Sequence, residues 1–254
     1  MSWFIGCKTL INRMRNYDQL KLWAGYDYEI NDKIKIRQPK IGEIIEMGEA
    51  KYFSTVSLLT ATPSEYKAPL FDIGIDWENI TDYDMFISFG RRVPIEDSAI
   101  LFGDLNLEEM RVFVNEADEI ALISDSGAII DRNIHFNINQ FLTKLHGFKK
   151  QVDIAGNAFT KRALIELNRQ DIEDSKNKDH ESKLLPLIST LVNSPGFKYN
   201  SKEVMNIGLF EFMDSVRRLQ TIRHADAVLK GMCSGMVDSS KIKASAYDCF
   251  KDIA

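Results

Sequence analysis

The longest regular pattern of apolar residues lies near the C-terminus, between Gly208 and Met232. Its apolar positions recur every three or four residues: Leu209, Phe212, Met213, Val216, Leu219, Ile222, Val228, Leu229 and Met232. This spacing predicts a long helix with one apolar stripe. Burying about eight such side chains contributes on the order of 12–24 kcal/mol before the ordering entropy is subtracted. We therefore expect this helix to pack against the rest of the chain or against a partner.

Shorter stretches with the same spacing occur in the first half of the chain. They predict helices over residues 41–47, 49–61, 62–73, 82–92 and 133–145. Thr62 is placed to cap the third helix, with Pro63 in its first turn and Pro69 as a kink or early end. Gly147 is placed to end the fifth.

The fourth of these helices has its own start signal and inward-facing residues. Thr81 or Asp82 is suited to cap it. The residues that we expect to face inward are Met85, Phe86 and Phe89.

Alternation of apolar and polar residues marks the predicted strands. Lys33 to Arg37 predicts a short half-buried strand that follows a loop or loose hairpin in residues 16–32. A second group of short runs predicts a small antiparallel hairpin or meander: residues 111–114, 119–124 and 128–131. Asp125, Ser126 and Gly127 supply the turn between the last two.

The second half of the chain is predicted to be helical. A helix is expected from about Val152 to beyond Gln170, with these apolar anchors: Ile154, Ala158, Ala163, Leu164 and Leu167. The polar run 171–183 predicts a solvated helix end followed by a flexible linker. Residues 184–192 are strongly apolar, and we expect them to be buried.

Together these patterns predict an α+β fold that is predominantly helical, with a small antiparallel β hairpin or meander in the middle and a helical C-terminal half. The expected organisation is an N-terminal arm (1–32), an α+β domain (33–150) and a helical domain (151–254) that carries the charged linker 171–183. At 254 residues the chain is long enough to bury a substantial core.

Net charge and cysteine content limit the classes of protein and the cellular compartments that fit this sequence. A formal net charge of -5 argues against a protein that coats nucleic acid through bulk positive charge. Three cysteines are too few and odd in number for a disulfide framework, so a reducing, cytosolic setting is expected. The first fifteen residues are interpreted as an ordinary N-terminal segment, with a signal peptide as the alternative. No run of eighteen apolar residues predicts a membrane span.

One short motif and several groups of polar residues are candidates for a catalytic or metal site. Gly231 to Gly235 has the spacing of a nucleophile elbow centred on Cys233, but that turn requires a preceding strand, and the glycines suit a helix end better. The four histidines lack the spacing of a zinc site: His135, His146, His180 and His224. The acids Asp72, Asp76, Glu78, Asp82 and Asp84 form a cluster that suits helix capping better than acid–base chemistry or a metal. The sequence therefore predicts no enzyme, cofactor or metal centre.

The predicted long helix also carries three arginines. Arg217, Arg218 and Arg223 could contact phosphates along one helix edge. Asp214 and Asp226 lie close enough along the helix for local ion pairs, which is the alternative interpretation.

Several long runs of the chain, within about residues 16–245, carry a family resemblance: IRQPKIGEIIEMGEAKYFSTVSLLTATPSEYKAPLFDIGIDWENITDYDMFI, ILFGDLNL, KLHGFKKQVDIAGNAFTKRALIELNRQD, LLPLISTLVNSPGFKY and FMDSVRRLQTIRHADAVLKGM. In these runs the chain resembles a family of uncharacterised phage and prophage proteins from Gram-positive hosts. These proteins are encoded among head and tail genes, and the family pattern carries no catalytic motif. The resemblance implies a role in virion morphogenesis.

The preferred form of that role is a tail assembly chaperone that keeps the tape-measure protein soluble in the host cytoplasm. The alternatives are a minor structural component of the virion, at the head–tail joint or in the tail, and a nucleic-acid-binding phage factor. No membrane partner is expected. A chaperone for an amphipathic helix needs apolar grooves between its own helices, and the segment 171–183 could close over a client.

The candidate partner-binding residues follow from that role. They are Leu184, Leu187, Leu191, Phe210, Phe212, Met213, Arg217 and Arg218. The alternative for each apolar member is that it belongs to the protein's own core.

Overall fold

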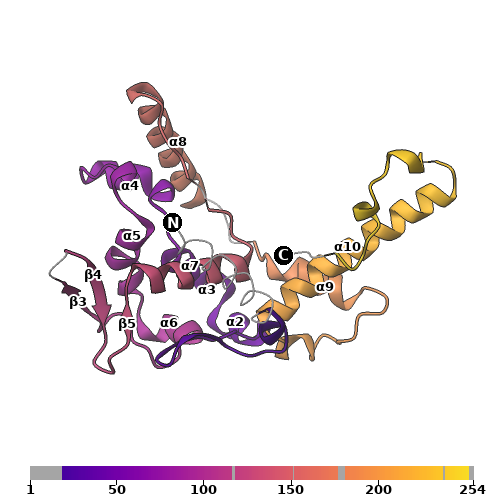
Figure 1. Cartoon of the computed structure of the whole chain (residues 1–254), viewed down its shortest axis with the longest axis horizontal. Coiled ribbons are helices and arrows are strands. Elements are labelled where there is room, and N and C mark those ends of the chain that lie inside the picture. Colours follow the sequence, from indigo (N-terminus) through magenta and orange to yellow (C-terminus); the bar gives the residue numbers. More distant parts are fainter. Residues whose placement is uncertain (1–18, 116–117, 151, 177–180, 237, 252–254) are drawn as a thin grey trace, which may run out of the picture. The chain divides into compact units, whose positions relative to one another are not determined.

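The computed structural model describes residues 19–115, 118–150, 152–176, 181–236 and 238–251 (Figure 1). Expectations for the first fifteen residues, for Cys7 and for His180 lie outside the described residues, as does the middle of the predicted linker, 177–180. The described fold is predominantly helical, with two small antiparallel sheets and a helical C-terminal half. The predicted α+β class is confirmed.

Contacts divide the chain into two compact units. Among the described residues, the N-terminal unit comprises those of 26–39 and 43–182, and the C-terminal unit comprises those of 19–25, 40–42 and 183–251. This division differs from the expected boundary at 150/151, because residues 153–176 make their contacts with the N-terminal unit.

The N-terminal unit contains short helices and two small sheets, and the first two residues of its helix 41–47 are assigned to the C-terminal unit. Its first elements are β1 (Tyr28–Asn31), β2 (Ile34–Ile36), α2 (Ile41–Met47), α3 (Glu49–Leu59), the 3-10 helix η1 (Pro63–Tyr66), α4 (Lys67–Asp72), η2 (Trp77–Asn79), α5 (Asp82–Ser88) and η3 (Gly90–Arg92). They are followed by α6 (Ile95–Phe102), β3 (Arg111–Val114), β4 (Ile120–Ile123), β5 (Ile129–Ile130), α7 (Arg132–His146) and α8 (Ala158–Lys176). The strands pair antiparallel as β1-β2 and as β3-β4-β5.

Helix ends in this unit follow the local signals in the sequence. A capping box joins Thr62 to Glu65, and a second joins Thr81 to Asp84. Gly147 ends α7 in the left-handed conformation that glycine adopts without strain (φ 66°). The predicted helix 62–73 is split into η1 and α4, and Pro69 lies in the first turn of α4, where a missing N–H is tolerated.

Three expectations for this unit are corrected. Phe89 is exposed rather than inward-facing, because α5 ends at Ser88 and the Phe89 ring stacks on Tyr66 with 6.0 Å between centroids. Helix α6 was not predicted. Its eight residues follow Pro94 directly and bury Ser98, Leu101 and Phe102.

The third correction concerns α8. It begins at Ala158 rather than Val152, because the Asn157 side chain accepts a hydrogen bond from Thr160 N–H at 2.9 Å. Ile154, an expected anchor, is 81% exposed, and the buried side chain of α8 is Ile165.

The expected anchors Ala163 and Leu167 of α8 are also exposed. The helix continues through residues 171–176, so the first part of the predicted linker is helical.

The core of the N-terminal unit includes a hydrophobic cluster to which both α4 and α8 contribute. Its buried members are Ala61, Ala68, Leu70, Trp77, Met85 and Ile165. Ile165 is the buried residue that α8 contributes to this cluster, and the half-buried Leu164 packs against it. Figure 1 shows α8 extending beyond α4.

The C-terminal unit consists of two main helices and a tail. Its elements are α9 (Leu184–Val192), η4 (Val204–Asn206), α10 (Leu209–Cys233), η5 (Ser239–Lys241) and η6 (Ala244–Ala246). Lys40 forms an antiparallel bridge with Gly208, and Ile41 N–H donates to Ile207 C=O at 3.2 Å, which joins the short segment 40–42 to this unit. The predicted long helix is confirmed to within a residue at each end.

No helix in the described parts of the chain combines the length and the apolar character needed to cross a bilayer.

Candidate functional site

The predicted partner-binding residues of α9 and α10 fall into two groups. Leu184, Leu191 and Phe212 are buried within the protein, so they belong to its interior as the structure stands. The remaining apolar candidates are half-buried: Leu187, Phe210 and Met213. The first half of α10 therefore packs within the protein, with only part of each half-buried side chain open to solvent.

The second half of α10 exposes apolar side chains instead. Ile222 is 47% exposed and Leu229 is 43% exposed. They are seven residues apart, so they share one face of the helix. We call this pair, Ile222 and Leu229, the α10 apolar face. The expected stripe is thus divided: its N-terminal part is buried, and its C-terminal part lies at the surface.

The arginines of α10 make hydrogen bonds inside the C-terminal unit. Arg218 Nη1 donates to the carbonyl oxygens of Cys249 (2.7 Å) and Lys251 (3.1 Å), which holds the tail against the helix. Arg217 Nε donates to Met213 C=O at 3.2 Å. Arg223 Nη2 donates to Ser194 Oγ at 2.9 Å. These guanidinium groups already have protein acceptors, so a phosphate backbone would have to compete with them.

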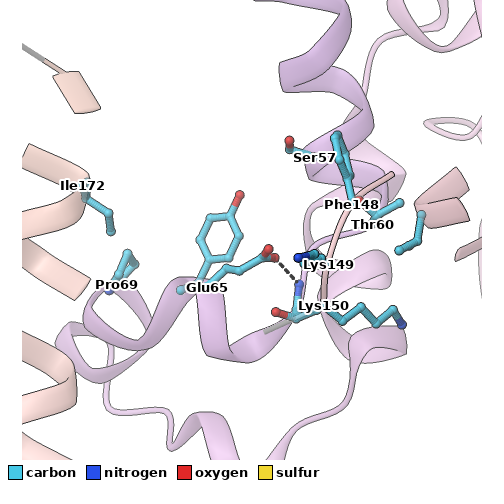
Figure 2. Close-up of a pocket in the computed structure, with 11 residues that line it drawn as sticks. Ser57, Thr60, Glu65, Pro69, Phe148, Lys149, Lys150 and Ile172 are labelled. Atoms are coloured by element: carbon cyan, nitrogen blue, oxygen red, sulfur yellow. Dashed lines mark hydrogen bonds between the residues drawn. The ribbon is translucent and has the colours of Figure 1, made fainter. Parts of the chain in front are cut away.

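The N-terminal unit contains a cleft of about 550 Å³ that the sequence did not predict (Figure 2). Its lining comes from α3, η1, α4, α7, the segment after α7, and α8: Ser57, Thr60, Thr62, Glu65, Tyr66, Pro69, Thr143, Phe148, Lys149, Lys150 and Ile172. In Figure 2, Ile172 and Pro69 lie on one side of the cleft and Ser57, Thr60 and Phe148 on the other, with Glu65 between them. No local signal could have found this site, because its residues come from segments far apart in the sequence.

Aromatic packing fixes one wall of the cleft. The Phe148 ring lies against the His146 ring, 5.4 Å between centroids, and His146 is buried. His146 Nδ1 donates to Leu142 C=O at 2.7 Å, so its Nε2 accepts from the Tyr52 hydroxyl at 2.6 Å. Burial lowers the pKa of His146 to about 4, so the ring is neutral near pH 7.

Tyr66 and Glu65 give the cleft a polar edge. The pKa of Tyr66 is raised, first by burial and then by the charge of Glu65, so its hydroxyl stays protonated. Glu65 Oε2 accepts from Thr62 N–H at 2.8 Å as part of the capping box. The cleft thus combines apolar walls with hydroxyl, ammonium and carboxylate groups at its rim, which suits an amphipathic segment.

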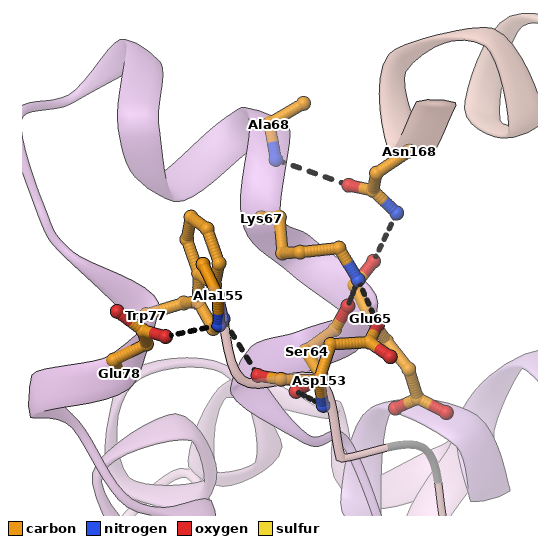
Figure 3. Close-up of polar contacts among 9 residues, drawn as sticks. All are labelled: Ser64, Glu65, Lys67, Ala68, Trp77, Glu78, Asp153, Ala155 and Asn168. Atoms are coloured by element: carbon orange, nitrogen blue, oxygen red, sulfur yellow. Dashed lines mark hydrogen bonds and ion pairs between the residues drawn. The ribbon is translucent and has the colours of Figure 1, made fainter. Parts of the chain in front are cut away.

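The wall formed by α8 is held in place by polar contacts (Figure 3). Asn168 Oδ1 accepts from Ala68 N–H and its Nδ2 donates to Glu65 C=O, both at 3.0 Å. In the segment before α8, Ala155 N–H donates to Glu78 at 2.7 Å, and Asp153 C=O accepts from the Trp77 indole at 3.2 Å. Because Ile172 lines the cleft, these contacts also set the width of the cleft.

Three acids of the predicted acidic cluster also hold α8 against the rest of the N-terminal unit. Asp72 accepts two hydrogen bonds from Arg169 (2.8 and 2.9 Å), and Lys161 contacts both Asp76 (2.5 Å) and Glu78 (2.6 Å). The hydrogen bond from Arg169 lowers the pKa of Asp72, and those from Lys161 lower the pKa of Asp76 and Glu78.

The other two acids of the cluster have equally local partners. Asp82 pairs with Lys150 at 2.8 Å, and Asp84 belongs to the Thr81 capping box. Within the described part of the chain, no three His, Cys, Asp or Glu side chains are arranged to hold a metal ion.

Cys233 is the last residue of α10, and it is exposed. A helix therefore precedes it, where a nucleophile elbow has a strand.

The comparisons with known proteins bear on the C-terminal unit. Residues 175–253 match a family model described as the second domain of YomV, a protein of Bacillus phages and prophages. The matched range covers less than a third of the chain and nearly coincides with the part of the C-terminal unit that holds α9, α10 and the tail. This similarity is consistent with a phage protein. Comparison with curated proteins gives no match, and comparison with solved structures gives none.

Proposed function

We propose that this protein is a phage virion assembly factor that acts by binding another phage protein, in the manner of a tail assembly chaperone for the tape-measure protein. The observation that carries the proposal is the similarity of residues 175–253 to a phage protein domain, in a unit that exposes the α10 apolar face. An apolar pair on a helix surface is suited to packing against a helix of a partner.

The cleft of the N-terminal unit supports the same proposal. A client that is an amphipathic helix presents apolar side chains at intervals of three or four residues. A cleft of about 550 Å³ with apolar walls and a charged rim can receive one or two of them. The α10 apolar face and the cleft are therefore better suited to binding a protein than to catalysis on a small molecule.

The test is co-expression with the tape-measure protein of the same phage, followed by affinity capture. The variant is Ile222→Ser with Leu229→Ser, which removes the α10 apolar face. The matched control is Gln220→Ser with Ala227→Ser, which places the same two serines at exposed positions of the same helix. We expect the control to capture the tape-measure protein as the natural protein does, and the apolar-face variant to lose most of it.

Mass spectrometry of purified virions separates the chaperone from a structural component. A chaperone is absent from finished particles, whereas a minor component of the tail or head–tail joint is present in a fixed number of copies. If the natural protein fails to capture the tape-measure protein, the chaperone role is rejected. Capture of DNA that weakens steeply with salt would point instead to the nucleic-acid-binding alternative.

A further inference from the structure

β3 is one of the two outer strands of the sheet β3-β4-β5 (Figure 1). All four residues of β3 are exposed. The exposed fractions of Val112, Phe113 and Val114 are 46%, 53% and 52%. An exposed strand edge of this kind is a template for pairing with another chain.

The direction of the backbone groups follows from one hydrogen bond. Asn115 N–H donates to Glu119 C=O at 3.0 Å, so the backbone of Asn115 faces β4. Successive residues of a strand face opposite sides. Phe113 therefore also faces β4, and the N–H and C=O groups of Val112 and Val114 face outward. Among the described residues, none makes a backbone hydrogen bond to this outer edge.

β5 is the other outer strand of the sheet, and it has two residues, Ile129 and Ile130. The Tyr83 hydroxyl donates to the carbonyl oxygens of Ile120 (3.1 Å) and Ile130 (2.7 Å), where β4 extends past the end of β5. With four residues, β3 is the longer of the two outer strands.

Both faces of the strand are apolar at this edge. The register places Val112 and Val114 on the same face as Ile120, and Phe113 on the opposite face with Ile129. Protected edge strands usually carry an inward charge, a proline or a bulge, and β3 has none of these. Its one charge, Arg111, is at the first position and pairs with Asp125 at 3.0 Å.

Carboxylates flank the strand at both ends. Glu108 and Glu109 lie just before β3, and Asp118 and Glu119 lie in the turn after it. The register that pairs Val112 with Val114 of a second copy would place Glu108 beside Asp118 of that copy. This repulsion disfavours self-pairing and favours a partner with positive charge at both ends.

We propose that the open edge of β3 binds an extended segment of another protein by strand addition, and that the segment carries alternating apolar residues flanked by Lys or Arg. Main-chain hydrogen bonds to Val112 and Val114 would supply affinity, and the flanking acids would select the partner. This proposal goes beyond the proposed function, which rests on the α10 apolar face and the cleft and not on β3, so either one can fail without the other.

The experiment uses the full-length protein and a fluorescent peptide of the form Lys-Lys-Thr-Val-Thr-Val-Thr-Lys-Lys. Fluorescence anisotropy measures binding, and NMR hydrogen exchange measures protection of individual amides. We expect binding that protects the amides of Val112 and Val114 and leaves that of Phe113 unchanged. A peptide with Glu in place of every Lys, and one with Pro in place of both Val residues, should bind at least tenfold more weakly.

Two protein variants test the two parts of the proposal. Val114→Pro removes an outward N–H that the ladder does not use, so the strand should persist while binding weakens about fivefold. The double variant Glu108→Lys, Glu109→Lys should weaken binding of the basic peptide and strengthen binding of the acidic one. Glu46→Lys, an exposed charge reversal on α2, is the control and should change neither.

Three results would overturn the proposal. They are binding without protection of Val112 and Val114, no binding of the basic peptide, and a peptide-free dimer with the same two amides protected. The last would identify a second copy as the occupant. If Val114→Pro unfolds the protein, binding by the variant Glu108→Lys with Glu109→Lys decides between these outcomes.

Discussion

The ammonium group of Lys67 lies 2.5 Å from Oδ2 of Asp153, across 86 residues of sequence. Lys67 is 2% exposed and also donates to Ser64 C=O. This ion pair joins α4 to the segment that leads into α8 (Figure 3). A buried ammonium depends on its partner, because the cost of removing it from water is offset only while the carboxylate is present.

Asp153→Ala should therefore lower the free energy of unfolding by about 3 kcal/mol, since it leaves the Lys67 charge buried without its carboxylate. Lys67→Met should lower the free energy of unfolding by less than Asp153→Ala does. An apolar side chain of similar length takes the buried position, and Asp153 can still contact water. Urea denaturation of both variants checks this order. An equal or smaller loss for Asp153→Ala would show that the pair does not hold a buried charge.

Stability should fall as the pH is lowered from about 6.5 to 4. Burial lowers the pKa of both His135 and His146 to about 4, whereas an unfolded histidine titrates near 6.5. Between these values the unfolded chain binds protons that the folded one does not, so each histidine destabilises the fold by up to ~3 kcal/mol as the pH approaches 4. Denaturation at pH 7.5, 5.5 and 4.5 measures this loss.

His135→Phe isolates one of the two contributions. His135 Nε2 is buried and has no hydrogen-bond partner among the described residues. Its ring lies against those of Phe86 and Tyr83, at 4.7 and 5.3 Å between centroids. An apolar ring removes the unsatisfied nitrogen, so stability at pH 7.5 should be unchanged or higher and the pH dependence shallower. A pH dependence equal to that of the natural protein would contradict the assignment.

Gly90→Ala should destabilise the N-terminal unit by about 1–3 kcal/mol. A Cβ at this position would lie 2.6 Å from Cδ2 of Phe86, whose ring is buried and cannot move aside freely. Gly156→Ala is the control, because a Cβ there meets no atom of the described residues within 4 Å. Thermal denaturation should separate the two variants, and a similar melting temperature for both would contradict the predicted clash.

Arg218→Ala should release the tail of the C-terminal unit. Its guanidinium group binds the carbonyl oxygens of Cys249 and Lys251, so its loss should raise the rate of thiol labelling at Cys249. Arg217→Ala removes the same charge from the same helix without a tail contact, and it should leave that rate unchanged. Mass spectrometry after timed alkylation measures each cysteine separately, and equal labelling of Cys249 in both variants would contradict the role of Arg218.

Local signals in the sequence predicted much of the secondary structure. The caps at Thr62 and Thr81, the end of α7 at Gly147 and the extent of α10 all follow from residues within one helical turn of each other. The sequence did not predict the start of α8, because the segment before it is held by hydrogen bonds of Asp153 with the distant residues Ser64 and Trp77.

The candidate site was less predictable. The apolar spacing of α10 identified a helix that needs burial, but not which part of the stripe is buried. Phe212 is in the interior, whereas Ile222 and Leu229 are at the surface. The pairing of the acidic cluster with Lys161 and Arg169 joins residues more than eighty positions apart, which no local pattern can specify.

By itself the sequence determined the helical periods, the turns, the caps and the α+β class, because each depends on backbone hydrogen bonds and side chains a few residues apart. Only the tertiary structure decided which apolar residues are buried, where the cleft opens and which strand edge remains unpaired. Those features depend on contacts between distant segments, whose ordering entropy must be offset by burial that occurs only once the whole fold is assembled.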